Sequence, residues 1–229
     1  MSDATPNRRT IRSFVRRAGR MTPSQERALA ELGPLFGIEY TPRLLDLDEI
    51  FGRSADRVLE IGFGNGDTLT LAAIKNPDLD FLGIEVHQPG VGHCLLKAHE
   101  AGITNLRIIA YDALEVLENQ VADGALARID LLFPDPWPKK RHHKRRIIRE
   151  PFLKLAAGKL RPGGALHIAT DWADYAEHID AVMRNCNEFR LAERREHGGD
   201  RPLDRHTTKF EARGLRQGHR IRDWHFIRS

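Results

Sequence analysis

Cysteine is scarce in this 229-residue chain, and its scarcity excludes several classes of protein. The two cysteines, Cys94 and Cys186, lie far apart and form no CxxC motif. A disulfide-stabilised secreted scaffold and a cysteine-rich zinc site both need denser cysteine spacing. We therefore expect two free thiols that fill core positions in a reducing, cytoplasmic environment.

Long apolar runs are also missing from the chain. No run approaches the roughly 18 apolar residues that a transmembrane helix requires, and the N-terminus lacks the apolar core of a secretion signal. The composition, 41% hydrophobic and 30% charged, is that of a soluble globular protein. We therefore expect neither a transmembrane helix nor secretion, although the Arg-rich, acid-poor start shares its composition with mitochondrial transit peptides.

Acidic residues are absent from two stretches that are rich in cations. Residues 8–20 contain six arginines, and residues 139–149 contain seven lysines and arginines. The net charge of +4 understates this asymmetry. Clusters of cations attract polyanions, so the pattern favours a nucleic acid or an anionic membrane as partner.

From residue 57 onward, short apolar runs alternate with longer helix-forming segments. The pattern predicts strands at 58–61, 80–84, 106–110, 129–133 and 165–169, and helices at 67–75, 88–101, 113–120, 147–160 and 171–185. Such alternation is typical of a doubly wound, mostly parallel α/β sheet. The tail is harder to assign and predicts strands near 189–192 and 224–227. Residues 1–54 predict a basic arm with short helices near 27–32 and 44–51.

Three glycines lie between the first predicted strand and the first long helix. Gly62, Gly64 and Gly66 permit a sharp turn and a close approach of the backbone to a ligand. Their GxGxG spacing differs from the GxGxxG fingerprint of dinucleotide-binding folds. The glycines alone are a weak signal for any one ligand.

Acids lie at four successive strand ends, at Glu60, Glu85, Asp112 and Asp135. Glu85 is placed to accept both hydroxyls of a ribose, Asp112 to accept from an adenine amino group, and Glu60 to face an ammonium. A ligand with these groups but no pyrophosphate is S-adenosylmethionine, whose sulfonium suits a row of carboxylates. The alternative is that these acids cap helix N-termini.

The segment FPDPWPKKRHHKRR, residues 133–146, is the most distinctive in the chain. Its three prolines exclude a helix interior or a central strand, so Asp135 is predicted on a stiff turn at a strand end. Ligands bind at that edge of open α/β sheets. Six of the eight residues from Lys139 are cations. A carboxylate beside such a tract indicates chemistry on a polyanion; a proline-bounded loop with a solvated charge run is the alternative.

Several motifs together resemble bacterial tRNA (guanine-N7-)-methyltransferases of the TrmB type. They are RSFVRRAGRMT (12–22), VLEIGFGNG (58–66), FLGIEVH (81–87), YDA (111–113), LLFPDPWPKKRHHKRR (131–146), TDW (170–172) and TKFEARG (208–214). The resemblance implies a seven-stranded class I methyltransferase fold. We expect this domain at residues 55–229, preceded by a basic N-terminal arm and short helices at 1–54. The resemblance also implies S-adenosylmethionine as donor and the guanine at position 46 of the tRNA variable loop as acceptor, giving 7-methylguanosine.

The resemblance also assigns roles to residues of this chain. Asp135 is expected to be catalytic. The residues expected to hold the cofactor are Glu60, Gly62, Gly64, Gly66, Glu85, Asp112 and Asp135. The residues expected to contact tRNA are Lys139, Arg141, His142, His143, Lys144, Arg145, Arg146, Asp171, Thr208, Lys209, Phe210 and Glu211.

Some of these residues have structural alternatives. Trp137 either stacks on a base or packs beneath its loop. Asp171 either contacts the Watson–Crick edge of guanine or caps a helix. Residues 208–211 are either a disordered tail or a loop that closes on the target base. No metal is expected, because no third ligand with zinc-like spacing follows the two adjacent histidines, His142 and His143.

Three rival functions stay open from the sequence. The first is a non-catalytic RNA-binding protein on a methyltransferase fold, against which the glycines and the four acids argue. The second is an NAD-dependent oxidoreductase, which the GxGxG spacing disfavours. The third is a methyltransferase that acts on another RNA or on protein, which only the motifs at 133–146 and 208–211 disfavour. We expect tRNA and no membrane as partner, and no obligatory protein partner is evident.

Overall fold

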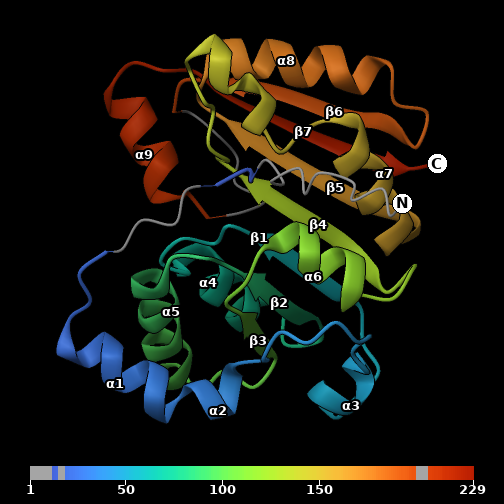
Figure 1. Cartoon of the computed structure of the whole chain (residues 1–229). Helices are drawn as coiled ribbons and strands as arrows, with labels where there is room; N and C mark the ends of the chain where they lie inside the picture. Colours follow the sequence, from blue (N-terminus) through green and yellow to red (C-terminus); the bar gives the residue numbers. More distant parts are fainter. Residues whose placement is uncertain (1–11, 15–18, 200–205) are drawn as a thin grey trace, which may run out of the picture.

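The computed structural model describes residues 12–14, 19–199 and 206–229. Of the predicted N-terminal segment at 1–54, residues 1–11 and 15–18 lie outside the described residues. The elements, labelled in Figure 1, are α1 (Pro23–Glu31), α2 (Gly33–Phe36), α3 (Leu47–Phe51), β1 (Arg57–Ile61), α4 (Asp67–Lys75), β2 (Asp80–Ile84), α5 (Gln88–Glu100), β3 (Leu106–Ile109), α6 (Ala113–Asn119), β4 (Leu126–Leu132), the 3-10 helix η1 (Lys140–Arg145), α7 (Glu150–Lys159), β5 (Leu160–Thr170), α8 (Ala173–Arg184), β6 (Phe189–His197), α9 (Lys209–Arg216) and β7 (Ile221–Arg228).

The strands form one seven-stranded sheet in the order β3-β2-β1-β4-β5-β7-β6. The first five strands are parallel, and β7 runs antiparallel to both β5 and β6. The predicted doubly wound, mostly parallel sheet is therefore confirmed. β2 and β3 lie on one side of β1, and β4 and β5 lie on the other, so the strand order reverses between β1 and β4. Open α/β sheets bind ligands at such a switch point, at the edge where the parallel strands end.

Helices cover both faces of the sheet (Figure 1). The side chains of each strand pack alternately against the two helical layers. In β1, Leu59 packs into a core with α6, α7 and α8, whereas Val58 packs into a second core with α1, α2, α4 and α5. Successive side chains of a strand point to opposite faces, so each strand joins both cores. β2 is buried throughout, which matches its central place near the switch point.

Several boundaries differ from the sequence-based expectation. Helix α7 begins at Glu150 rather than 147, and β5 begins at Leu160, where the helix was expected to end. β5 therefore carries the Arg161–Gly164 stretch through a register shift against β4. Phe133 is not part of β4, because its φ of 53° takes the chain out of the strand. The division of the chain at residues 54 and 55 stays a prediction.

Both cysteines are free thiols, as expected. Desolvation by burial raises the pKa of the Cys94 thiol strongly, and burial also raises the pKa of Cys186 to about 11. Neither thiol is therefore ionised near neutral pH, which suits a core-filling role. Among the helices that the structure describes, none has the length and apolar content that crossing a membrane requires.

Candidate active site

The glycine loop joins β1 to α4 through three residues in the left-handed region. Gly62, Gly64 and Gly66 have φ of 75°, 62° and 76°. Gly66 is the N-cap of α4, and a Cβ atom there would lie 2.3 Å from the Sγ atom of Cys94. A side chain at this position is excluded both by backbone conformation and by space. The predicted strand–glycine loop–helix geometry is present, and it exposes main-chain groups at the switch point.

Glu85 follows β2 and ties that strand to the glycine loop. Its Oε2 atom accepts a hydrogen bond from the Gly64 amide at 2.8 Å. Its Oε1 atom accepts from the amides of Val86 and His87 at 2.7 and 2.9 Å. Three main-chain donors thus hold one carboxylate in a single orientation at the carboxyl edge of the sheet. Glu85 caps no helix.

Glu60 and Asp112 flank this carboxylate on the neighbouring strands. Glu60 is buried in β1 and accepts a hydrogen bond from the Thr68 hydroxyl at 3.1 Å. Asp112 is the N-cap of α6 and accepts from the Leu114 amide at 3.0 Å. The helix-cap alternative is therefore correct for Asp112 and wrong for Glu60. All three acids are held at adjacent strand ends.

The turn that carries Asp135 has a strained backbone. Phe133 and Trp137 have φ of 53° and 48°, and they are the non-glycine residues with positive φ in the described chain. Each such conformation costs on the order of 1–3 kcal/mol and persists only where the surroundings enforce it. Asp135 is exposed between these two residues, beyond the end of β4. The turn presents this carboxylate at the same edge as the glycine loop.

Arg146 holds the Asp135 turn in place through a hydrogen bond to its backbone. The residue is 1% exposed, and its side chain donates from Nε to the Pro136 carbonyl at 2.9 Å. Its guanidinium also bonds to Asp174 on α8 and lies 4.9 Å from the ring centroid of Tyr175. The hydrogen bond from Arg146 holds the pKa of Asp174 below its ordinary value. The expectation that Arg146 binds a tRNA phosphate does not fit this burial, and Arg146 instead fastens the turn to α8.

We expect Arg146→Ala to lower the free energy of unfolding by about 2–4 kcal/mol. The substitution removes charge-assisted hydrogen bonds and leaves the Pro136 carbonyl without its donor. Urea unfolding measures the change. Lys140→Ala, at an exposed cation of η1, is the control and should shift stability by less than about 0.5 kcal/mol. Equal stability of Arg146→Ala and the unmodified protein would contradict this role.

Trp137 and the described parts of the N-terminal segment meet at the site. The Trp137 indole donates to the Ser13 carbonyl at 3.1 Å and lies 4.8 Å from the guanidinium carbon of Arg145. Its packing alternative is therefore the one the structure supports. Gly19 approaches the β2–α5 connection so closely that a Cβ would lie 2.7 Å from the ring of His87. Through Ser13 and Gly19 the N-terminal segment lies against the site, a placement that the sequence analysis did not predict.

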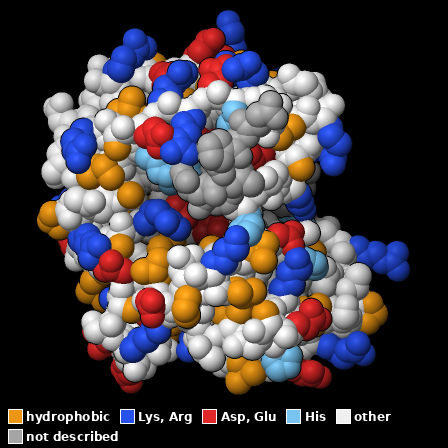
Figure 2. All heavy atoms as spheres, turned by 180° about the vertical axis from the view of Figure 1, so that it is seen from behind, with side chains coloured by type: hydrophobic (Ala, Val, Ile, Leu, Met, Phe, Trp, Pro, Cys, Tyr) orange, Lys and Arg blue, Asp and Glu red, His pale blue; other side chains and the backbone are white. Residues whose placement is uncertain are grey.

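Most of the cationic tract forms the 3-10 helix η1. Lys139, Arg141 and Lys144 are exposed, and Arg145 and the two histidines are half-buried. Desolvation and the neighbouring cations, first Arg141, lower the pKa of His142. On the face in Figure 2, Lys and Arg side chains are spread among acidic and apolar ones. Within the described ranges, no His, Cys, Asp and Glu cluster has the form of a metal site.

Residues 208–211 begin helix α9, so both expectations for this segment, a disordered tail and a loop, are wrong. Thr208 is the N-cap and accepts from the Glu211 amide at 3.0 Å. Thr208 and Glu211 are buried, whereas Lys209 and Phe210 are exposed. The ring of Phe210 lies 3.8 Å from where a Cβ of Gly64 would be. Helix α9, at the left of Figure 1, therefore reaches the glycine loop.

Asp171 caps no helix either. The N-cap of α8 is Trp172, which makes no side-chain cap bond, and Asp171 instead pairs with His219 at 3.0 Å. Asp171, Glu85 and Asp135 all follow parallel strands and thus share the carboxyl edge of the sheet. The helix-cap alternative for Asp171 is wrong.

Sequence reasoning missed a row of buried polar side chains that runs across strands β4, β5 and β7. His167 on β5 lies 3.1 Å from Asp223 on β7 and 3.7 Å from Asp130 on β4. Burial alone raises the pKa of Asp130, but Arg128 and His167 together bring that pKa below its ordinary value. Asp130 and His167 were predicted only as parts of strands, and Asp223 lies just before the strand predicted near 224–227. Their charges are visible in the sequence, but their mutual contact depends on the strand order.

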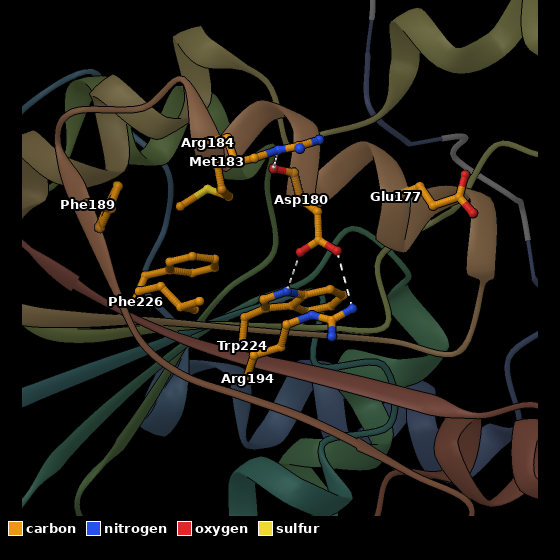
Figure 3. A pocket seen from close by; sticks show the side chains of 9 residues that line it. Glu177, Asp180, Met183, Arg184, Phe189, Arg194, Trp224 and Phe226 are labelled. Carbon is orange, nitrogen blue, oxygen red and sulfur yellow. Dashed lines mark hydrogen bonds and ion pairs between the residues drawn. The ribbon is translucent and has the colours of Figure 1, made fainter.

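A groove of about 480 Å³ lies between α8 and the strands β6 and β7 (Figure 3). Asp180 accepts from the Trp224 indole at 2.8 Å and pairs with Arg194 at 3.3 Å across it. None of the residues that line it is one of the predicted site residues. The residues predicted from the sequence to carry the chemistry therefore lie outside this groove.

Known proteins resemble this chain in sequence and in fold. A family model described as "Putative methyltransferase" matches residues 54–224. A curated tRNA (guanine-N(7)-)-methyltransferase of Shewanella piezotolerans is 53% identical over 220 residues, 96% of this chain and 93% of that protein. One of Alkalilimnicola ehrlichii is 50% identical over 234 residues, 98% of this chain and 95% of that protein. A solved 16S rRNA (adenine(1408)-N(1))-methyltransferase from Catenulisporales acidiphilia, with cosubstrate SAM, has a TM-score of 0.55 at 16% identity, covering 80% of this chain and 92% of that one. This last likeness shows the fold alone.

Proposed function

The chain belongs to the tRNA (guanine-N(7)-)-methyltransferase family, and from this premise we propose that it methylates N7 of the guanine at position 46 of the tRNA variable loop, using S-adenosylmethionine and giving 7-methylguanosine. The observation that carries the proposal is the convergence of the held acids, the left-handed glycine loop and the strained Asp135 turn at one sheet edge.

The residues at the switch point fit S-adenosylmethionine. Gly62 leaves open space where a side chain would stand, since nothing lies within 4 Å of its Cβ position. Glu85 is oriented by three amides for a ribose diol, and Asp112 lies one strand further for the adenine. Glu60 is placed for the ammonium. When bound, S-adenosylmethionine supplies an electrophilic methyl group on a cationic sulfur.

The chemistry asks little of the protein beyond positioning. Guanine N7 already has a lone pair in the plane of the ring, so no general base is needed to make it nucleophilic. Holding N7 in line with the methyl carbon converts a two-body encounter into a reaction within one complex. Positive charge moves onto the purine as the methyl group arrives, and the Asp135 carboxylate favours that charge electrostatically. Asp171 accepts from the Watson–Crick edge and fixes the base.

The exposed cations of the tract supply affinity for the tRNA backbone. Lys139, Arg141 and Lys144 lie beside the Asp135 turn, where backbone phosphates pass when a base enters the site. Their attraction is independent of sequence and weakens with salt. The same proposal assigns the substrate-facing side of the site to the start of α9, that is, to Thr208, Lys209, Phe210 and Glu211. Phe210 lies beside the glycine loop.

We expect replacement of Lys139, Arg141 and Lys144 by Ala to weaken tRNA binding and to flatten its salt dependence. Removing one cation–phosphate pair reduces the slope of log K against log salt by roughly 0.7–0.9. Filter binding across a salt series measures the slope, and calorimetry should give an unchanged Kd for S-adenosylmethionine. The control removes three exposed cations elsewhere, Arg43, Lys75 and Arg184. Equal slopes for the two triple variants would count against a role of the tract.

Binding and transfer assays separate the rival functions. Calorimetry with S-adenosylmethionine and with NAD tests the cofactor, and the proposal expects binding of the first alone. Incubation with methyl-labelled S-adenosylmethionine, tRNA, ribosomal RNA and protein then tests the acceptor. Cofactor binding without label in any acceptor would support a non-catalytic RNA-binding protein. Label in an acceptor other than tRNA would retain the fold and reject the substrate.

A further inference from the structure

Asp171 is held on one side only. Its Oδ2 atom lies 3.0 Å from Nδ1 of His219, and its Oδ1 atom accepts no hydrogen bond from any residue that the structure describes. The side chain is 26% exposed. One oxygen is therefore anchored to the protein while the other keeps its acceptor capacity in a partly exposed side chain, which suits a carboxylate that receives a ligand.

Helix α9 packs against this carboxylate through a glycine. A Cβ atom at Gly214 would lie 2.6 Å from Oδ2 and 2.9 Å from Cβ of Asp171. Gly214 is buried in the interior of α9 with helical φ, so no turn requires a glycine there. Glycine is less favourable than alanine in a helix. The absence of a side chain at this position serves the close approach of Asp171.

The end of α9 brings His219 back to the same carboxylate. Gly218 has φ of 77°, and the His219 amide donates to the Gly214 carbonyl at 2.9 Å. The His219 ring stands edge-on to Trp172, with centroids 6.3 Å apart. The turn therefore places Gly214 and His219 against Asp171 from one short segment.

We propose that Gly214 and His219 form a clamp that fixes the Asp171 carboxylate for the Watson–Crick edge of the target guanine, with His219 acting as a positioning residue. The terminal torsion of an aspartate is broad, so an unclamped carboxylate rotates freely. Guanine presents N1–H and N2–H donors in one plane, and accepting both requires a fixed carboxylate plane. Orientation of this kind determines how closely N7 approaches the methyl group. The inference rests on the proposed function.

Four variants test the clamp. His219→Ala removes the donor, His219→Asn restores an N–H donor close to the Nδ1 position, and Gly214→Ala displaces Asp171 without harming helix propensity. Gln217→Ala, an exposed residue of the same turn, is the matched control. We expect kcat/KM for tRNA to fall about ten- to a hundredfold in His219→Ala and Gly214→Ala. His219→Asn should recover most of the loss, with the S-adenosylmethionine Kd unchanged in all four.

A tRNA that carries inosine at the target position separates positioning from general damage, because inosine lacks the 2-amino group but retains N7. If the clamp acts through that edge, His219→Ala costs much less on the inosine tRNA than on the guanine tRNA. Equal losses on both tRNAs, or activity of His219→Ala within twofold of the unmodified protein, would overturn the clamp. Failure of the unmodified protein to methylate tRNA, with intact cofactor binding, would reject the proposed function instead.

Discussion

Asp135→Asn is expected to lower the rate of methyl transfer by about a hundred- to a thousandfold under single-turnover conditions. The substitution keeps the shape of the side chain, so the strained turn between Phe133 and Trp137 and its bond to Arg146 persist. What disappears is the negative charge at the strand end where the purine becomes cationic. The effect should therefore fall on the chemical step.

Rapid-quench measurement with saturating tRNA and S-adenosylmethionine checks this prediction. Asp78→Asn, at an exposed acid away from the site, serves as the control and should leave the rate unchanged. Unfolding in urea should give the same midpoint for both variants. A rate for Asp135→Asn within about threefold of the unmodified protein would show that the carboxylate serves the turn rather than the reaction.

Glu85→Ala is expected to raise the Kd for S-adenosylmethionine about a hundredfold or more. The substitution leaves the amides of Gly64, Val86 and His87 without their acceptor and removes the carboxylate proposed for the ribose. Loss of two hydrogen bonds to a charged group at about 1.5–3 kcal/mol each accounts for this size. The loss should appear in binding before any tRNA is added.

Calorimetric titration measures the Kd directly. Glu85→Gln retains one oxygen acceptor and should lie between Glu85→Ala and the unmodified protein. Glu118→Gln, an exposed residue of α6, is the control with no expected change. If Glu85→Ala bound S-adenosylmethionine as tightly as the control, the cofactor would have to lie elsewhere than at the β2 end.

The parallel strands, and the position of the candidate acids at their ends, were predictable from the sequence for local reasons. β2 spans residues 80–84 as expected, because a short apolar run lies there between Asn-Pro and Glu. The glycines at 62, 64 and 66 fix a turn that only glycine tolerates. Strand ends carry the acids, and parallel strands end together. These inferences need no knowledge of distant contacts.

Other features depend on contacts between segments far apart in the chain. Arg146 belongs to a run of cations, and only the packing of η1 on α8 shows that it is buried beneath Pro136. The partnership of His219 with Asp171 spans 48 residues. Helix α9 is different, because Thr208 followed by Glu211 three residues later is a capping pattern that the sequence displays. That signal was present and was outweighed by the polar composition of the tail.

The central claim is tested most directly by a matched pair of tRNA transcripts that differ only in whether position 46 is guanine or adenine. Each is incubated with the purified protein and methyl-labelled S-adenosylmethionine, and the label is mapped by nuclease digestion and nucleoside chromatography. Our account predicts label in 7-methylguanosine from the first transcript and none from the second. Label in another nucleoside, or equal label in both transcripts, would contradict it.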